Sequence, residues 1–163
     1  MKPIDSTAEI LFLRTCDGSI NKRWANWAYD MLVAGFDTES LVMLAGETEF
    51  YNQFELQRMA DNVLQELNLK WDDRELVYRN YVRYVVEKAL RDEIGVAAAL
   101  DILKEAYSDL DHEKLFLAFY LLHHAKHSLD NYGFQHYWDG ATRENIDEIV
   151  KAYFEEWLRR LTE

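Results

Sequence analysis

Histidine side chains concentrate in one stretch of the sequence, between residues 112 and 130. Four of the five histidines lie there, at positions 112, 123, 124 and 127. On an α-helix, which turns by about 100° per residue, His123 and His127 lie one turn apart on one face, and Asp130 follows about one turn later. Two imidazoles at this i, i+4 spacing can hold one metal ion. His123, His127 and Asp130 are therefore the candidate metal ligands or pocket residues of the chain.

The motifs that normally complete such a site are absent from the sequence. The chain has neither an HExxH sequence nor the pair of ExxH sequences found in di-iron bundles. It also lacks the Gly-x-Ser-x-Gly turn of serine hydrolases and a glycine-rich phosphate loop. Cys16 is followed by an acidic residue, which does not activate a thiol. We therefore assign no catalytic residue, metal or cofactor from the sequence.

The chain is strongly acidic. Its 163 residues include 30 Asp and Glu against 18 Lys and Arg, a formal net charge of −12 with His neutral. The excess concentrates in residues 37–75, which carry ten acidic and three basic residues, a net charge of −7. Such a surface repels nucleic acid and anionic membranes, because phosphate binding needs clustered Lys and Arg. It attracts a basic protein, so we expect a protein partner or self-association, and neither nucleic acid nor a membrane.

Two stretches rich in aromatic residues are the candidate partner-binding surfaces. Interfaces favour Tyr, Trp and Phe, which contribute large contact area at a small entropic cost, and acidic rims steer basic partners. The first stretch comprises Asp37, Glu39, Glu47, Glu49, Phe50 and Tyr51. The second, in the segment 131–141, comprises Tyr132, Phe134, Tyr137 and Trp138. The alternative for both stretches is that their aromatic side chains fold back onto the core.

Cysteine usage and the first residues bear on the cellular compartment. Cys16 is the only cysteine and cannot form an internal disulfide, which fits a reducing compartment. Residues 1–19 contain one short apolar stretch behind acidic residues, which is not the pattern of a signal peptide. The sequence also lacks a run of 18 apolar residues. We therefore expect a cytoplasmic protein.

Apolar residues recur with helical periodicity along the whole chain. One proline and six glycines are too few turn residues for a many-stranded fold. A hydrophobic content of 49% excludes a disordered chain. The i, i+3, i+4 spacing predicts helices over about 6–13, 20–35, 38–46, 56–67, 73–93, 96–108, 112–130 and 142–161. The sequence therefore predicts an all-α fold, a single compact bundle of about six to eight helices in one domain over residues 1–163.

Capping residues mark several of these predicted helix ends. Ser6 and Thr38 are placed as N-caps, and Gly35 and Gly95 are placed to end the helices that precede them. The segment near 112–130 is apolar around most of its circumference. A helix of that kind is normally buried, so we expect it to be the central helix of the bundle.

Residues 24–69 carry a recurring pattern of helix ends. One helix ends at Gly-x-Asp-Thr (35–38), a short helix ends at Leu-Ala-Gly (44–46), and a longer helix ends at Glu-Leu-x-Leu (66–69). This pattern resembles that of small, uncharacterised bacterial proteins that are all-helical. The resemblance implies a bacterial helical domain, and no activity, because the matching residues are helix stops, caps and core residues. Some small acidic proteins are immunity or antitoxin partners, which is an analogy of type alone.

Three hypotheses for the function follow. The leading one is a non-enzymatic cytosolic helical protein that binds another, basic protein through its acidic and aromatic surface. The alternative is a small-ligand or metal-binding protein, or an enzyme, with a polar pocket at His123, His127 and Asp130. The third is a homodimer whose self-interface contains Trp138, Tyr153 or Trp157.

Overall fold

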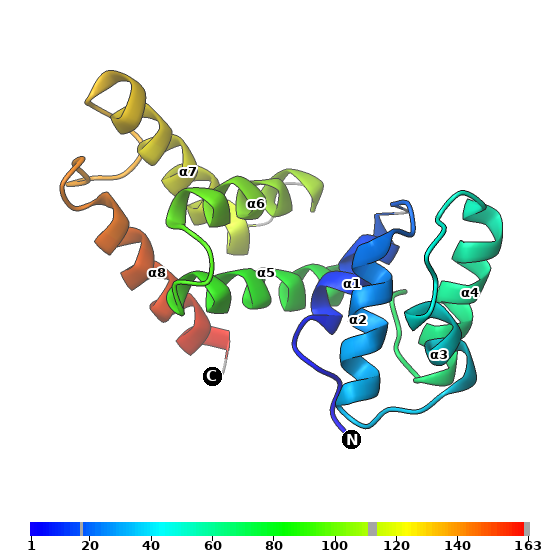
Figure 1. Ribbon diagram of the computed structural model, residues 1–163. Helices are drawn as coiled ribbons and strands as arrows, with labels where there is room; N and C mark the ends of the chain where they lie inside the picture. Colours follow the sequence, from blue (N-terminus) through cyan, green and yellow to red (C-terminus); the bar gives the residue numbers. More distant parts are fainter. Residues whose placement is uncertain (17, 111–113, 162–163) are drawn as a thin grey trace. The chain divides into compact units, whose positions relative to one another are not determined.

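The computed structural model describes residues 1–16, 18–110 and 114–161, and these residues form eight α-helices and no strand (Figure 1). The helices are α1 (Thr7–Thr15), α2 (Lys22–Val33), α3 (Glu39–Ala45), α4 (Gln53–Glu66), α5 (Arg74–Leu90), α6 (Val96–Asp109), α7 (Lys114–Tyr132) and α8 (Ile146–Leu161). The predicted all-α fold is confirmed, and each predicted helix has an observed counterpart. Among the described helices, none combines the length and the apolar character needed to cross a bilayer.

The helices group into two compact units along the chain. The first unit is Met1–Tyr81 and the second is Val82–Glu163, so α5 begins in one and ends in the other. Contacts among α1, α2, α3 and α4 build the first unit, and contacts of α6 with α7 and α8 build the second. The prediction of a single domain over residues 1–163 stays a prediction.

Two tryptophans of α2 lie at the centre of the first unit. Trp24 and Trp27 are buried, and their rings meet edge to face with centroids 6.3 Å apart. The indole Nε1 of Trp27 donates a hydrogen bond to Thr7 Oγ1 at 3.0 Å, which satisfies a polar group that is hidden from water. The buried core of this unit comprises Ile10, Ile20, Trp24, Trp27, Ala28, Met31, Leu41, Leu44, Leu56, Ala60, Val63 and Leu64.

An aromatic cluster between α7 and α8 forms the centre of the second unit. The ring of Phe119 lies 5.7 Å from that of Tyr153, 5.9 Å from that of Phe154 and 5.5 Å from that of Trp157, measured between centroids. Helix α7 buries one stripe of side chains, namely Phe116, Phe119, Leu122, Ala125 and Leu129. Its other apolar residues, such as Leu117 and Leu121, are only half-buried. The helix is therefore buried along one face with half-buried flanks, rather than around most of its circumference.

The ends of the helices differ from some of the predicted caps. Gly35 ends α2 with φ +104°, a conformation that glycine adopts without steric cost. Gly95 does not end α5; it is the N-cap of α6, and Asp92 takes the left-handed conformation after α5 with φ +57°. Ser6 and Thr38 occupy the N-cap positions of α1 and α3, but their side chains make no capping hydrogen bond. For Ser6 the reason is its helical backbone, because an N-cap side chain needs extended angles to reach the free N–H groups.

Asn68 gives a stability prediction in the first unit. It follows α4 with φ +56°, in a turn where Leu69 N donates to Leu64 O at 2.8 Å. A side chain in this left-handed conformation costs up to about 1 kcal/mol, and glycine avoids the cost. We expect Asn68→Gly to raise the free energy of unfolding by about 0.5 kcal/mol, measured by denaturant titration. The matched control is Asn62→Gly in the interior of α4, which should be destabilising because glycine weakens a helix. A loss of stability in both variants would contradict the expectation.

Candidate partner-binding surface

The linker between α3 and α4, together with the first turns of α4, encloses a shallow acidic pocket of ≈ 230 Å³. Its lining residues are Glu47, Glu49, Tyr51, Asn52, Glu55, Leu56 and Met59. We call this the acidic pocket. It places three carboxylates on one concave surface together with a tyrosine and two apolar side chains.

Hydrogen bonds from the start of α4 hold the linker in place. Asn52 is the N-cap of α4, and its side chain accepts a hydrogen bond from Glu55 N at 3.2 Å. The side chain of Gln53 donates to Ile20 O and to Phe50 O, both at 2.9 Å, and accepts from Ile20 N at 2.8 Å. These bonds tie the linker to the core of the first unit. The pocket is therefore formed before any partner arrives, which lowers the entropic cost of binding.

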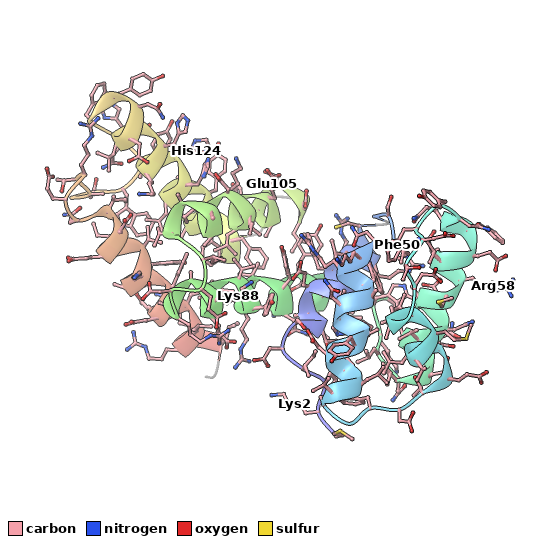
Figure 2. All side chains as sticks on the ribbon, viewed as in Figure 1. Lys2, Phe50, Arg58, Lys88, Glu105 and His124 are labelled. Carbon is pink, nitrogen blue, oxygen red and sulfur yellow. The ribbon has the colours of Figure 1, made fainter. Side chains whose placement is uncertain are left out.

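The carboxylates of the acidic pocket are not neutralised within the described part of the chain. Glu47, Glu49 and Glu55 form no ion pair with a described residue. In the same acidic stretch, Asp61 pairs with Arg14 at 2.6 Å and Glu75 pairs with Arg79 at 2.7 Å. Figure 2 shows the basic residue Arg58, which is exposed, extending outward from α4. The surface therefore presents an uncompensated negative charge to its surroundings.

The structure separates the predicted residues of the acidic stretch into three groups. Glu47, Glu49 and Tyr51 meet in the acidic pocket, and the Tyr51 side chain is 89% exposed. Asp37 and Glu39 are exposed at the start of α3, outside the residues that line the pocket. Phe50 is half-buried and its ring packs against the core, as the alternative for this stretch expects.

Sequence reasoning did not assign Asn52, Leu56 and Met59 to this surface. Leu56 and Met59 belong to the apolar stripe of α4, and periodicity alone places such residues in the core. Asn52 could have been recognised from the sequence, because asparagine is favoured at the N-cap of a helix. Its side chain accepts a hydrogen bond from the backbone N–H three residues later. The lining of a pocket depends on which side chains the linker leaves uncovered, and a periodic pattern does not contain that information.

One glutamine organises the aromatic loop that follows α7. The Gln135 Oε1 accepts hydrogen bonds from Tyr137 N and Trp138 N, both at 2.7 Å. Its Nε2 donates to Trp138 O at 2.5 Å and to Ala141 O at 3.3 Å. Arg143 Nε donates to Leu129 O at 2.6 Å, which ties the far side of the loop to α7. The loop is thus held by side chains that sequence reasoning did not single out.

The aromatic residues that were predicted as a binding surface in the segment 131–141 have two different environments. Tyr132, Phe134 and Tyr137 remain exposed, by 69%, 62% and 45%. Trp138 is half-buried and meets the Tyr153 ring edge to face at 5.7 Å, as the alternative for this stretch expects. Trp157 is 2% exposed within the second unit. Trp157 is therefore buried within its own unit, and Trp138 and Tyr153 are half-buried there. A self-interface that contains these residues stays a prediction.

The structure does not gather the candidate metal ligands into one site. His123 Nδ1 lies 3.3 Å from Asp101 Oδ1, His127 is exposed, and Asp130 Oδ2 lies 3.9 Å from Lys126 Nζ. Within residues 1–16, 18–110 and 114–161, no group of three His, Cys, Asp or Glu side chains is placed to hold a metal ion. Position 112 lies outside the described residues.

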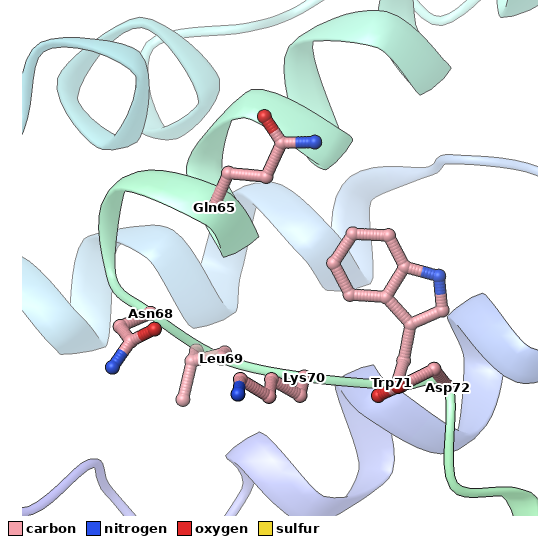
Figure 3. A pocket seen from close by; sticks show the side chains of 6 residues that line it. All are labelled: Gln65, Asn68, Leu69, Lys70, Trp71 and Asp72. Atoms are coloured by element: carbon pink, nitrogen blue, oxygen red, sulfur yellow. The ribbon is translucent and has the colours of Figure 1, made fainter.

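A second pocket, of ≈ 370 Å³, lies beside the segment that follows α4 (Figure 3). It is lined by Gln65, Asn68, Leu69, Lys70, Trp71 and Asp72. The Arg14 guanidinium lies over the Trp71 ring, 5.2 Å from the ring centroid, and also pairs with Asp61. Although this pocket is larger, its lining combines one cationic and one anionic side chain. The pocket therefore favours neither a cationic nor an anionic partner.

Comparisons with models of protein families, with curated proteins and with solved structures found no significant match. The described residues form an all-α protein whose first unit carries an acidic pocket without ion pairs to other described residues. The resemblance of residues 24–69 to small bacterial helical proteins stays a prediction.

Proposed function

We propose that this chain is a non-enzymatic, cytosolic helical protein that binds a basic partner protein through the acidic pocket of its first unit. The observation that carries the proposal is the position of Glu47, Glu49 and Glu55, which share one concave surface without an ion pair among the described residues. The exposed ring of Tyr51 lines the same surface. A pocket of this kind suits a Lys or Arg side chain of the partner.

The chemistry of the lining supports a basic side chain as the occupant. The charged end of Lys or Arg would meet the three carboxylates, and its aliphatic stem would pack on Leu56 and Met59. The net charge of −12 would steer a basic partner toward the surface from a distance. An immunity or antitoxin protein that neutralises a basic target is one example of the class, by analogy of type.

The exposed rings of the second unit form a second candidate contact. Phe134 and Tyr137 lie on the loop that Gln135 holds in place, and Tyr132 is the last residue of α7. Ordered, exposed aromatic side chains bind partners at a small entropic cost. The alternative function, a ligand or metal site at His123, His127 and Asp130, has no specific observation in its favour, because no three His, Cys, Asp or Glu side chains of the described residues are placed to hold a metal ion.

The proposal is tested by capture from a lysate of the native cell with tagged protein at low and moderate salt. We expect a stoichiometric basic protein that salt releases. The triple variant Glu47→Gln, Glu49→Gln, Glu55→Gln should weaken its binding by roughly 3- to 100-fold, since exposed ion pairs contribute about 0.2–1 kcal/mol each. The affinity of the identified protein is then measured by calorimetry with the purified components.

A matched control separates the location of the charge from its amount. Glu105, Glu148 and Glu155 are exposed in the second unit, and their replacement by Gln changes the net charge by the same amount. This control should retain nearly the full affinity. Equal loss in both triple variants, or a partner that salt does not release, would contradict the proposal. Recovery of the chain alone would favour a homodimer, which light scattering at two concentrations would detect.

A further inference from the structure

His123 of α7 contacts α6 through both nitrogens of its ring. Its Nδ1 lies 3.3 Å from Asp101 Oδ1, and its Nε2 lies 3.4 Å from Lys104 Nζ. The His123 side chain is only 12% exposed, whereas Asp101 is 65% exposed. Helices α6 and α7 lie side by side (Figure 1) and share the most extensive packing in the second unit. Asp101, His123 and Lys104 thus form a polar contact between the two helices.

The hydrogen-bonding capacity of Lys104 determines which ring nitrogen of His123 carries the proton. A lysine ammonium has hydrogens to donate and no lone pair, so Nε2 must accept from Lys104. The single proton of a neutral imidazole then lies on Nδ1, 3.3 Å from Asp101 Oδ1. We propose that His123 forms a pH-sensitive contact between α6 and α7. The contact is present when the ring is neutral with its proton on Nδ1, and it is lost when a proton binds to Nε2 and displaces Lys104.

The charged and titratable groups around the ring favour this behaviour. Helix α6 contributes Asp101 and Lys104, and α7 contributes His124 and His127, whose ring centroids lie 5.1 and 6.2 Å from that of His123. Burial lowers the pKa of His123, Lys104 lowers it further, and Asp101 acts in the opposite direction. A proton on Nε2 would therefore create a second cation about 3.4 Å from the ammonium of Lys104. The Asp101 contact would survive, since a protonated ring keeps its hydrogen on Nδ1 and gains a positive charge near the carboxylate.

The same cluster reaches the aromatic loop. The His124 ring lies 4.4 Å from that of Tyr120 and 5.4 Å from that of Tyr137, measured between centroids. Burial lowers the pKa of His124 as well, and Lys104 and His127 act in the same direction. Acidification therefore charges a group of side chains that connects α6, α7 and the loop.

The direction of the pH dependence follows from the folded state. Because the folded pKa of His123 lies below its ordinary value near 6.5, the unfolded chain binds more protons in that range. The stability of the second unit is therefore complete above pH 6.5 and decreases as the pH falls from there through the folded pKa. Each unit of difference between the two pKa values increases the opening equilibrium by up to about tenfold.

The test combines imidazole nitrogen NMR with amide hydrogen exchange on the full chain. At pH 7.5 we expect the Nδ1–H form of His123, and between pH 7.5 and 5.5 we expect increased opening of the α6 and α7 amides. Lys104→Met removes the opposing cation, so it should raise the pKa of His123 and reduce this pH dependence. Asp101→Asn should lower the pKa, because the carboxylate favours the protonated ring. An Nε2–H form at pH 7.5 would overturn the proposal.

His127→Gln is the matched control on the same helix, because His127 is exposed and contributes least to the lowered pKa of His123. It should leave both the tautomer and the pH dependence of exchange nearly unchanged. Circular dichroism at pH 7.5 establishes that each variant is folded. A Lys104→Met protein that is folded and titrates like the wild type at His123 would also overturn the proposal.

Discussion

Phe119→Ala is expected to lower the free energy of unfolding of the second unit by about 3–5 kcal/mol, the usual cost of removing a buried phenylalanine ring. Phe119 is fully buried and contacts Tyr153, Phe154 and Trp157, all on α8. These large, ring-shaped side chains close only partly over the space that the lost ring leaves. Denaturant titration followed by tryptophan fluorescence measures the change, and Trp157 reports directly because its ring lies 5.5 Å from that of Phe119.

Two further variants keep this prediction testable if the alanine protein fails to fold. Phe119→Leu retains most of the apolar volume and should cost clearly less than the alanine variant. Tyr132→Ala removes an aromatic ring that is 69% exposed on the same helix, and should change the stability by no more than about 0.5 kcal/mol. A similar loss from Tyr132→Ala and Phe119→Leu would show that burial in the aromatic cluster is not the cause.

Thr7→Val is expected to lower the free energy of unfolding of the first unit by about 1–3 kcal/mol. Valine preserves the shape of threonine but removes the oxygen that accepts the indole N–H of Trp27 at 3.0 Å. Thr7 is 5% exposed and Trp27 is 3% exposed, so water does not replace the lost acceptor. A buried donor without a partner costs its full desolvation free energy. Thermal and denaturant unfolding of the purified proteins measures the effect.

A double-mutant cycle isolates this hydrogen bond from the packing. Trp27→Phe removes the donor and some apolar area, and in that background Thr7→Val should cost much less than it does alone. Thr7→Ser keeps the hydroxyl group and should lose only the contribution of one methyl group, about 0.8 kcal/mol. Additive effects of Thr7→Val and Trp27→Phe would contradict the assigned role of the bond.

The positions of the helices could be predicted from local patterns in the sequence. Apolar residues at helical spacing led to all eight described helices, because an amphipathic stripe is a property of neighbouring residues in the chain. Gly35 ends α2 as predicted, since its φ of +104° is a requirement that glycine meets best. The acidic character of residues 37–75 was equally readable, because charge is a matter of composition.

The partners of individual side chains depended on the tertiary structure. Phe50 and Trp138 belong to aromatic stretches that look alike in the sequence, yet both are half-buried, whereas Tyr51 and Phe134 stay exposed. The same holds for His123, whose i, i+4 partner in the sequence is His127. Its polar contacts come instead from α6, a different helix.

The sequence by itself determined the helices, the acidic charge and the types of residue available for binding. Only the tertiary structure decided that Glu47, Glu49 and Glu55 share a pocket while Asp37 and Glu39 lie outside the residues that line it. The physical reason is the separation along the chain of the residues that determine each property. Helix formation and net charge arise from residues close in the chain. The pocket arises where the linker before α4 leaves side chains of that helix uncovered, and no local pattern encodes that packing.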